Sequence, residues 1–350
     1  MSVRALTVEP GVADSARLDD LPPLGPLADG SMRVETLLVG VCGTDREIIA
    51  GEYGTPPPGD DRLVLGHESI VRIIDPPSGG GFATGDLVVP IVRRPDPVPC
   101  SACAAGEWDM CQNGLYTEHG ISGAHGFARD QFDLDPHFAV PVPPELGDLG
   151  VLVEPASVVA KAWEQIERIG SRAHWAPRTA LITGAGPVGL LAALLAVQRG
   201  FETHVLDRHT DGPKPELVAA LGAGYHTGAL VDACGRPDIV VECTGVGSIV
   251  LDAMEHSAVT GIVCLTGIGS GGRPVELDAA ELNRRLVLEN DVVFGTVNAN
   301  RRHYEAAVEA LAAADRGWLE RIVTRRIPLA DWPVALEKHD DDVKVVLDLE

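Results

Sequence analysis

The sequence predicts an α/β protein of two parts, an irregular antiparallel β part followed by a doubly wound part with a parallel sheet. At 350 residues the chain is too long for one ordinary domain. Residues 1 to about 150 hold short apolar runs between Gly- and Pro-rich turns, whereas later residues alternate β-branched strands with apolar helices. We expect the first part to span 1–155 and the second 156–295, with 296–350 returning to the first.

The apolar runs of the first part are its predicted strands. They are separated by turn signals such as PPPGDD and PPSGGG, where Pro and Gly interrupt a strand. We predict no long helix in this part. The runs are MRVETLLVGV, LVLGHESIVRII and DLVVPIV.

The second part opens with a predicted helix over 154–170, which has apolar or small residues at helical spacing and ends at a glycine. After a break at Pro177, strands and helices alternate, as in a parallel sheet covered on both faces. The final fifty residues predict a helix and then a short strand. The predicted strands are 179–184, 202–207, 222–226, 238–245, 261–267 and 291–297, and the predicted helices are 187–200, 214–223 and 248–258.

The charge of the chain argues against polyanionic partners. A formal net charge of -23 repels nucleic-acid phosphates and anionic membranes, so we expect neither nucleic acid nor membrane as a partner. The N-terminal residues lack an apolar run behind basic residues, and no segment approaches the length of a membrane span. We therefore expect a cytoplasmic protein.

A glycine-rich turn indicates dinucleotide binding. Gly184, Gly186 and Gly189 stand between a β-branched strand and an apolar helix, and Asp207 ends the next strand. These glycines permit a tight turn, close approach of a pyrophosphate and close packing of helix on strand. Asp207 favours NAD by bonding the adenosine ribose, while Arg208 could meet a 2′-phosphate, so NADP stays open. The alternative is a glycine turn that binds nothing.

A metal site is indicated nearer the N-terminus. Cys42, His67 and Glu68 offer a thiolate, an imidazole and a carboxylate, a mixture that suits zinc with an exchangeable position. Glu154, at the junction of the two parts, is the candidate for a further carboxylate. Each residue also has a simpler interpretation: a buried thiol, a surface histidine, a solvated acid and a charge at a helix N-terminus.

Three of the seven cysteines form a second cluster. Cys100, Cys103 and Cys111 have the short spacing of a structural zinc lobe, and such clustering points to metal before disulfides. A closed site of four ligands then needs another donor, such as Asp96. The alternative is a lobe that folds without metal.

At these residues the sequence resembles the zinc-dependent medium-chain dehydrogenases, and within them the glucose 1-dehydrogenase branch known from archaea. The similarity covers nearly the whole chain, although members with a complete lobe carry four cysteines. The broad family is indicated by GVCGTD, GHE, the cysteine lobe, GAGPVG and Asp207. The branch is indicated by CGTDREIIAGEYG, VVPIVRRP, LYTEHGISGAHGFARD, LVEPAS and FGTVNANRRHYEAAV.

The resemblance implies a GroES-like catalytic domain, a Rossmann domain and specific residue roles. Cys42, His67 and Glu154 would bind the catalytic zinc, with Glu68 able to join or leave it. Thr44 would hydrogen-bond the reacting hydroxyl, Glu118 would contact the sugar or a metal-bound water, and Asn298 would lie beside nicotinamide and substrate. The expected cofactor-binding positions are Gly184, Gly186, Pro187, Val188, Gly189, Asp207, Arg208, Thr244 and Asn298.

The implied activity is zinc-dependent oxidation of a sugar hydroxyl, taking a glucose-like aldose to its 1,5-lactone with hydride transfer to NAD(P)+. The resemblance also implies a homodimer or homotetramer. A polyol, cyclitol or amino-alcohol dehydrogenase with the same machinery is the alternative among enzymes. A nucleotide-binding redox sensor without catalytic activity is the alternative from another class.

Overall fold

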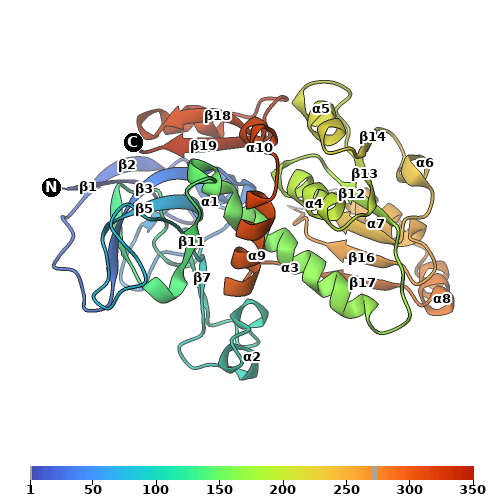
Figure 1. Cartoon of the computed structure of the whole chain (residues 1–350), viewed down its shortest axis with the longest axis horizontal. Coiled ribbons are helices and arrows are strands. Elements are labelled where there is room, and N and C mark those ends of the chain that lie inside the picture. Colours follow the sequence, from blue (N-terminus) through green and yellow to red (C-terminus); the bar gives the residue numbers. More distant parts are fainter. Residues whose placement is uncertain (1, 270–273) are drawn as a thin grey trace. The chain divides into compact units, whose positions relative to one another are not determined.

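The computed structural model describes residues 2–269 and 274–350 and confirms the predicted α/β fold class (Figure 1). The chain divides into two compact units. Unit 1 comprises residues 1–157 and 299–350, and unit 2 comprises residues 158–298. Helix α3 (Val153–Gly170) begins in the first unit and continues in the second.

Unit 1 is organised around a sheet with the strand order β11-β6-β5-β3-β19-β18, to which β10 is added by pairing with β3. The last strand of the chain, β19, pairs antiparallel with β3, so the red C-terminal strands lie beside the blue N-terminal ones in Figure 1. The bounds are β3 (Met32–Gly40), β5 (Glu68–Asp75), β6 (Leu87–Pro90), β10 (Gln131–Leu134), β11 (Ala139–Val142), β18 (Val323–Pro328) and β19 (Lys344–Asp348).

Two smaller sheets complete the β structure described in unit 1. One has the order β2-β1-β4 and the other β7-β8-β9. The aromatic rings of Phe127 and Phe132 stack 5.2 Å apart in a buried apolar cluster under the main sheet. The bounds are β1 (Val3–Val8), β2 (Arg17–Leu21), β4 (Leu63–Val64), β7 (Arg93–Arg94), β8 (Thr117–His119) and β9 (Gly123–Ala124).

The helices of residues 1–150 are short, as predicted, and the longer helix of the unit, α9, lies in the returning segment. Helix α2 sits in a loop that extends away from the main sheet (Figure 1). The bounds are α1 (Gly43–Ile49), α2 (Ser101–Ala104), the 3-10 turns η1 (Trp108–Met110), η2 (Pro136–Phe138), η3 (Gly147–Leu152) and η4 (Leu329–Asp331), α9 (Arg301–Ala312), α10 (Arg316–Ile322) and α11 (Trp332–Leu336).

Unit 2 contains a parallel sheet with the order β14-β13-β12-β15-β16-β17. This order reverses direction between β12 and β15, which is the switch point where a doubly wound sheet binds a nucleotide. The helix after β12 packs within the unit and is largely buried. Its residues are therefore apolar on every face. The strands are β12 (Thr179–Thr183), β13 (Glu202–Leu206), β14 (Gly224–His226), β15 (Ile239–Glu242), β16 (Ile262–Leu265) and β17 (Val292–Gly295). The helices are α4 (Pro187–Gln198), α5 (Pro213–Ala220), α6 (Leu230–Cys234), α7 (Gly247–His256) and α8 (Ala279–Glu289).

Each predicted strand of this sheet corresponds to an observed one, but two helices were not predicted. Helix α6 has only five residues, too few to give a periodic pattern, and α8 carries no buried residue. The returning segment also has two strands where one was predicted. Over residues 2–269 and 274–350, no helix is both long and apolar enough to span a bilayer.

Candidate active site

Cys42, His67 and Glu68 come together in unit 1. One possible ligand atom from each of these side chains lies within 4.8 Å of those of the other two. His67 and Glu68 are buried, and Cys42 is partly buried. The three residues therefore converge as the sequence suggested, and their donors form one compact group.

Pairing of neighbouring strands produces this convergence. Strand β3 runs to Gly40 and leads into Cys42, which caps α1, while His67 immediately precedes β5. Gly40 and Glu68 are directly paired in the register of β3 and β5. A Cβ at position 40 would collide with the ends of the Glu68 and Lys344 side chains, so a larger residue there would displace both.

Asp45 contacts both Cys42 and His67. Its Oδ2 accepts a hydrogen bond from the Cys42 backbone N–H at 2.8 Å, which fixes the first turn of α1. Its Oδ1 lies 3.4 Å from His67 Nδ1. A carboxylate on one ring nitrogen orients the imidazole and leaves the other nitrogen for a metal. Asp45 was not predicted as a site residue, although it stands in the GVCGTD motif.

Lys344 is a second residue that was not predicted from the sequence. The side chain is buried, its ammonium forms an ion pair with Glu68 Oε2, and it donates to the Val41 carbonyl at 3.2 Å. Lys344 opens β19, nearly three hundred residues after the GVCGTD motif, so no local pattern connects the two.

Glu154 lies in the first turn of α3 and is also buried. Burial, assisted by the negative charge of Glu68, raises the pKa of Glu154 to about 8. It is not among the side chains whose donor atoms lie within 4.8 Å of one another. Its carboxyl group is nevertheless close enough to the other acids for their charges to act on it.

The electrostatics of this group fit a divalent cation. Several acids share a buried region with a thiol, an imidazole and the Lys344 ammonium. Burial and the charge of Glu68 raise the pKa of Glu154, although His67 and Lys344 act in the opposite direction. A zinc ion would compensate these charges, and sulfur, nitrogen and oxygen are its ligands in proteins. The residues present therefore fit zinc.

Thr44 and Glu118 belong to the same unit. Thr44 is partly buried and lies in the first turn of α1, two residues after Cys42. Glu118 is buried in the middle of β8, and its Oε1 accepts hydrogen bonds from Arg93 Nε at 3.1 Å and Nη2 at 2.9 Å. The ion pair holds the Glu118 carboxylate in one place.

In unit 2 the glycine-rich turn has the geometry that a dinucleotide requires. Gly184, after β12, has a φ of 88°, a conformation that side chains rarely adopt. A Cβ on Gly186 would meet open space, whereas one on Gly189 would collide with the Gly184 carbonyl. Pro187 and Val188 form the first turn of α4. The backbone at the start of α4 is therefore open to a pyrophosphate.

Asp207 follows β13, and its carboxylate binds the glycine-rich turn. Oδ2 accepts the Ala185 N–H at 2.6 Å, and Oδ1 accepts the His209 N–H at 3.0 Å. Burial raises the pKa of the Asp207 carboxyl, but these N–H donors outweigh burial and the net pKa is lower than usual. Basic groups surround it: Arg208 is exposed, and Lys214 Nζ lies 3.0 Å from His209 Nδ1.

Thr244 and Asn298 are the remaining expected cofactor contacts. Thr244 follows β15, and its N–H donates to Glu242 Oε1 at 2.7 Å. Glu242 is fully buried and also accepts from the Thr183 hydroxyl at 3.1 Å, so it joins the ends of β12 and β15. Glu242 was not predicted from the sequence. Asn298 has a φ of 62°, in the left-handed region where Asn is enriched.

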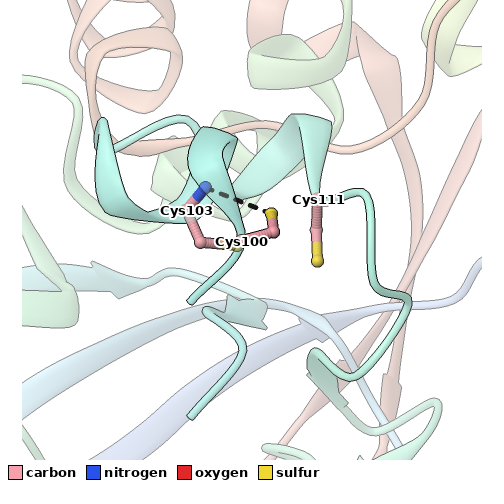
Figure 2. A group of neighbouring side chains, drawn as sticks. All are labelled: Cys100, Cys103 and Cys111. Carbon is pink, nitrogen blue, oxygen red and sulfur yellow. Dashed lines mark hydrogen bonds between the residues drawn. The ribbon is translucent and has the colours of Figure 1, made fainter. Parts of the chain in front are cut away.

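The three lobe cysteines lie together around α2, as Figure 2 shows. Possible ligand atoms of Cys100, Cys103 and Cys111 lie within 4.8 Å of one another. Hydrogen bonds from the N–H groups of Cys103 and Gln112 lower the pKa of the Cys100 thiol to about 6, which favours the metal-binding thiolate.

Asp96 is engaged elsewhere. Its Oδ1 accepts from the Val98 N–H at 2.8 Å and its Oδ2 from the Asn113 side-chain amide at 2.6 Å. It is not part of the group that the three sulfurs form. The structure thus brings the sulfurs together without the Asp96 carboxylate.

Comparison with known proteins identifies the family. The sequence model described as "Glucose dehydrogenase C-terminus" matches residues 147–349, and "Alcohol dehydrogenase GroES-like domain" matches residues 28–144. The chain belongs to the glucose dehydrogenase family. Within that family it is 39% identical to glucose 1-dehydrogenase 2 of Vulcanisaeta moutnovskia, with 99% of each chain covered. It is 40% identical to glucose 1-dehydrogenase of Thermoproteus tenax, covering 99% of this chain and 100% of that protein.

Solved structures of the glucose dehydrogenase family share the fold. The Haloferax mediterranei glucose dehydrogenase in complex with NADP, Zn and gluconolactone superposes with a TM-score of 0.91, at 32% identity and 99% coverage of both chains. An alcohol dehydrogenase from Thermotoga maritima, at 22% identity and a TM-score of 0.83, has the same fold. The predicted fold class, a GroES-like domain with a parallel-sheet domain, is therefore confirmed.

Proposed function

We propose that this protein is a zinc-dependent glucose 1-dehydrogenase, which oxidises a glucose-like aldose to its 1,5-lactone and transfers hydride to NAD(P)+. One observation carries the proposal: a partly buried thiol converges with a buried imidazole and a buried carboxylate in a chain that matches glucose 1-dehydrogenases over 99% of its length. The Haloferax relative in complex with NADP, Zn and gluconolactone has the same combination of cofactor, metal and product.

The metal ligands would be Cys42, His67 and Glu154, with Glu68 as an exchangeable fourth. Zinc, when bound there, would polarise the reacting sugar hydroxyl and lower its pKa. The ion pair with Lys344 gives Glu68 an alternative partner, so its carboxylate can be stabilised when it is not a ligand. Asp45 would keep the His67 ring in the orientation that presents one nitrogen to the metal.

Thr44 and Glu118 would act on the sugar directly. The Thr44 hydroxyl would hold the reacting oxygen by a hydrogen bond and accept its proton while passing its own proton outward to solvent, since a hydroxyl both accepts and donates. Glu118 would accept a hydrogen bond from another hydroxyl of the sugar. The buried Arg93 pairs with the Glu118 carboxylate and fixes it, which suits a specific hydrogen-bond acceptor.

The cofactor would bind at the glycine-rich turn. The open backbone at Gly186 would receive the pyrophosphate at the start of α4, with Pro187, Val188 and Gly189 forming the first helical turn. The nicotinamide, when bound, accepts the hydride. Asp207 and Arg208 would meet the adenosine ribose and its 2′-substituent, while Thr244 and Asn298 would contact the nicotinamide half.

A structural zinc would occupy the cysteine lobe. Cys100, Cys103 and Cys111 supply three thiolates, and the lowered pKa of Cys100 favours metal binding near neutral pH. A fourth donor would be the Asp96 carboxylate after it leaves its present partners, Val98 and Asn113. Metal analysis of the purified protein distinguishes one zinc per chain from two.

We also propose a cytoplasmic homodimer or homotetramer. The seven cysteines are all free thiols, as expected in a reducing compartment. Strand β17 lies at the edge of the sheet in unit 2, and Val287 and Leu288 on α8 are 66% and 64% exposed. An unpaired edge strand and exposed apolar side chains favour contact with a second copy. Light scattering coupled to size-exclusion chromatography measures the assembly.

The function is tested by a substrate panel. The zinc-loaded protein is mixed with NAD+ or NADP+ and with aldoses, polyols, cyclitols or amino alcohols, and absorbance at the reduced nicotinamide band is followed. We expect turnover with aldoses and formation of a lactone. Turnover with polyols alone would favour the alternative enzyme class, and inertness toward every alcohol with zinc bound would favour the redox sensor. Cys42→Ser serves as the control that removes a metal ligand.

A further inference from the structure

We propose that Asp109, in the turn η1 before Cys111, is a positioning residue that holds Glu118 in its sugar-binding place by fixing Arg93. The inference rests on the proposed function, because it treats Glu118 as a contact of the sugar. It adds a role for the cysteine lobe: the lobe supports substrate binding as well as its own fold.

The first contact is the ion pair between Arg93 and Glu118. They are directly opposite each other in the register of β7 and β8, so their side chains lie on the same face of that small sheet. Both side chains are buried, and two N–H groups of Arg93 reach the same oxygen of Glu118, at 3.1 and 2.9 Å. The Arg93 guanidinium also stacks 3.7 Å from the centre of the Tyr116 ring.

Asp109 supplies the next contact. Its backbone carbonyl accepts a hydrogen bond from Arg93 Nη1 at 3.3 Å, on the side of the guanidinium away from the Glu118 bonds. The guanidinium is rigid and planar, so fixing one donor fixes the directions of the others. The place of the Asp109 carbonyl therefore determines the orientation of the pair with Glu118.

The Asp109 side chain holds that carbonyl in place. Its Oδ1 accepts a hydrogen bond from Asn300 Nδ2 at 2.7 Å, and both residues are buried. Asn300 is itself fixed, because it caps α9 and its N–H donates to His303 Nδ1 at 3.1 Å. A carboxylate bound to the start of a helix cannot move without breaking a buried charge-assisted hydrogen bond.

The contacts thus connect the lobe to the substrate residue. The chain passes from Asp109 through Met110 to Cys111, one of the three clustered sulfurs of Figure 2. Loss of the Asp109 carboxylate would free η1, and Arg93 would lose the carbonyl that orients it. A buried guanidinium that loses one hydrogen-bond acceptor reorients toward a different acceptor. Glu118, which is paired with it, would move as well.

The experiment compares five variants with the wild type in steady-state kinetics for sugar and cofactor. Asp109→Ala and Asn300→Ala each remove one side of the hydrogen bond, and we expect each to raise the sugar KM by about 10-fold, the scale of one buried hydrogen bond. The cofactor KM should stay within about twofold, because unit 2 contributes none of these contacts. Asp109→Asn keeps an acceptor oxygen for Asn300 and should restore the sugar KM.

The matched control is Glu107→Ala. Glu107 also connects the lobe to α9, through Arg302 at 3.5 Å, but its side chain is 38% exposed, where an ion pair contributes little. Its sugar KM should be unchanged. The double variant Asp109→Ala/Asn300→Ala should resemble either single variant, because both changes remove the same hydrogen bond.

Three results would overturn the inference. An unchanged sugar KM in Asp109→Ala, with an active wild type, means that Asp109 does not position Glu118. Equal losses in kcat, both KM values and thermal midpoint mean a purely structural role. If Asp109→Ala does not fold, an unchanged sugar KM in Asn300→Ala overturns the inference instead. A wild type that oxidises no sugar would contradict the proposed function itself, which the same assay detects separately.

Discussion

Lys344 of β19 and Glu68 of β5 form an ion pair whose two side chains are almost wholly shielded from solvent, with 1% and 4% exposed. Removing one partner of a buried pair leaves a charge without compensation, which costs about 3–5 kcal/mol. We predict that Lys344→Met lowers the thermal midpoint strongly in zinc-free protein and less in zinc-loaded protein. The difference arises because zinc can take over the free Glu68 carboxylate.

Thermal unfolding with added zinc and with a chelator measures this effect. Lys338→Met is the matched control, because Lys338 is exposed and should change neither midpoint. An equal loss of stability in the zinc-free and zinc-loaded protein would contradict the proposed exchange of Glu68 between Lys344 and the metal.

The Thr44 hydroxyl is predicted to matter for catalysis and not for zinc binding. Thr44→Val removes the group that relays the proton of the reacting hydroxyl, and kcat should fall by roughly 10²–10⁴-fold, the range for a lost proton-transfer group. Thr44→Ser keeps a hydroxyl and should retain most of kcat. Rates at saturating sugar, with zinc content measured in parallel, check the prediction. Loss of zinc from Thr44→Val would point to a structural effect.

The two residues after β13 are predicted to discriminate between the two cofactors. Arg208→Gln should raise the KM of NADP+ by about 10-fold and leave that of NAD+ unchanged, because only NADP+ carries the 2′-phosphate. Asp207→Ala should raise the KM of NAD+ more than that of NADP+, since it removes both a ribose acceptor and a repulsive charge. Equal changes for both cofactors in Arg208→Gln would indicate that the 2′-phosphate binds elsewhere.

His119 is predicted to make the folded protein less stable at acidic pH. Burial lowers the pKa of His119 to about 3, and its ring stacks 5.1 Å from the Phe127 ring. The unfolded chain takes up a proton near pH 6.5 and the folded chain does not, so stability is lost as pH falls from 6.5 toward 3.

The matched variant is His119→Asn, whose side-chain amide can still donate to the His125 carbonyl that His119 Nδ1 contacts at 2.6 Å. Between pH 7 and pH 5 its thermal midpoint should fall by roughly 5 °C less than that of the wild type. Parallel pH profiles of the two proteins would show that another group is responsible.

How far the sequence predicts this molecule depends on how local each feature is. The strands of the parallel sheet and the turn at Gly184 were predictable, because hydrophobic period and glycine spacing act within one βαβ unit. The convergence of Cys42 and His67 was also predictable, since their motifs are distinctive. Lys344 and Glu242 were not, because a buried charge is recognised only by its partner, and the partner of Lys344 lies near the other end of the chain.

The hydrogen bond between Asp109 and Asn300 was not predictable from the sequence for the same reason. Each residue lies in a segment with a different local signal, the cysteine lobe for one and the start of α9 for the other. Nothing in either segment indicates the other. The short helix α6 and the exposed helix α8 were not predicted for a local reason, because neither has a buried apolar face of sufficient length.

The pairing of β19 with β3 also affects the order in which a newly made chain can fold. Strand β19 spans Lys344–Asp348, so the sheet beside Cys42 and Glu68 stays incomplete until these residues have left the ribosome. Residues 158–298 have all their strands much earlier and can fold during synthesis. Unit 1, which bears the proposed zinc ligands, would therefore mature after unit 2, and a chain stalled or cut before β19 would keep the nucleotide-binding unit without a competent metal site.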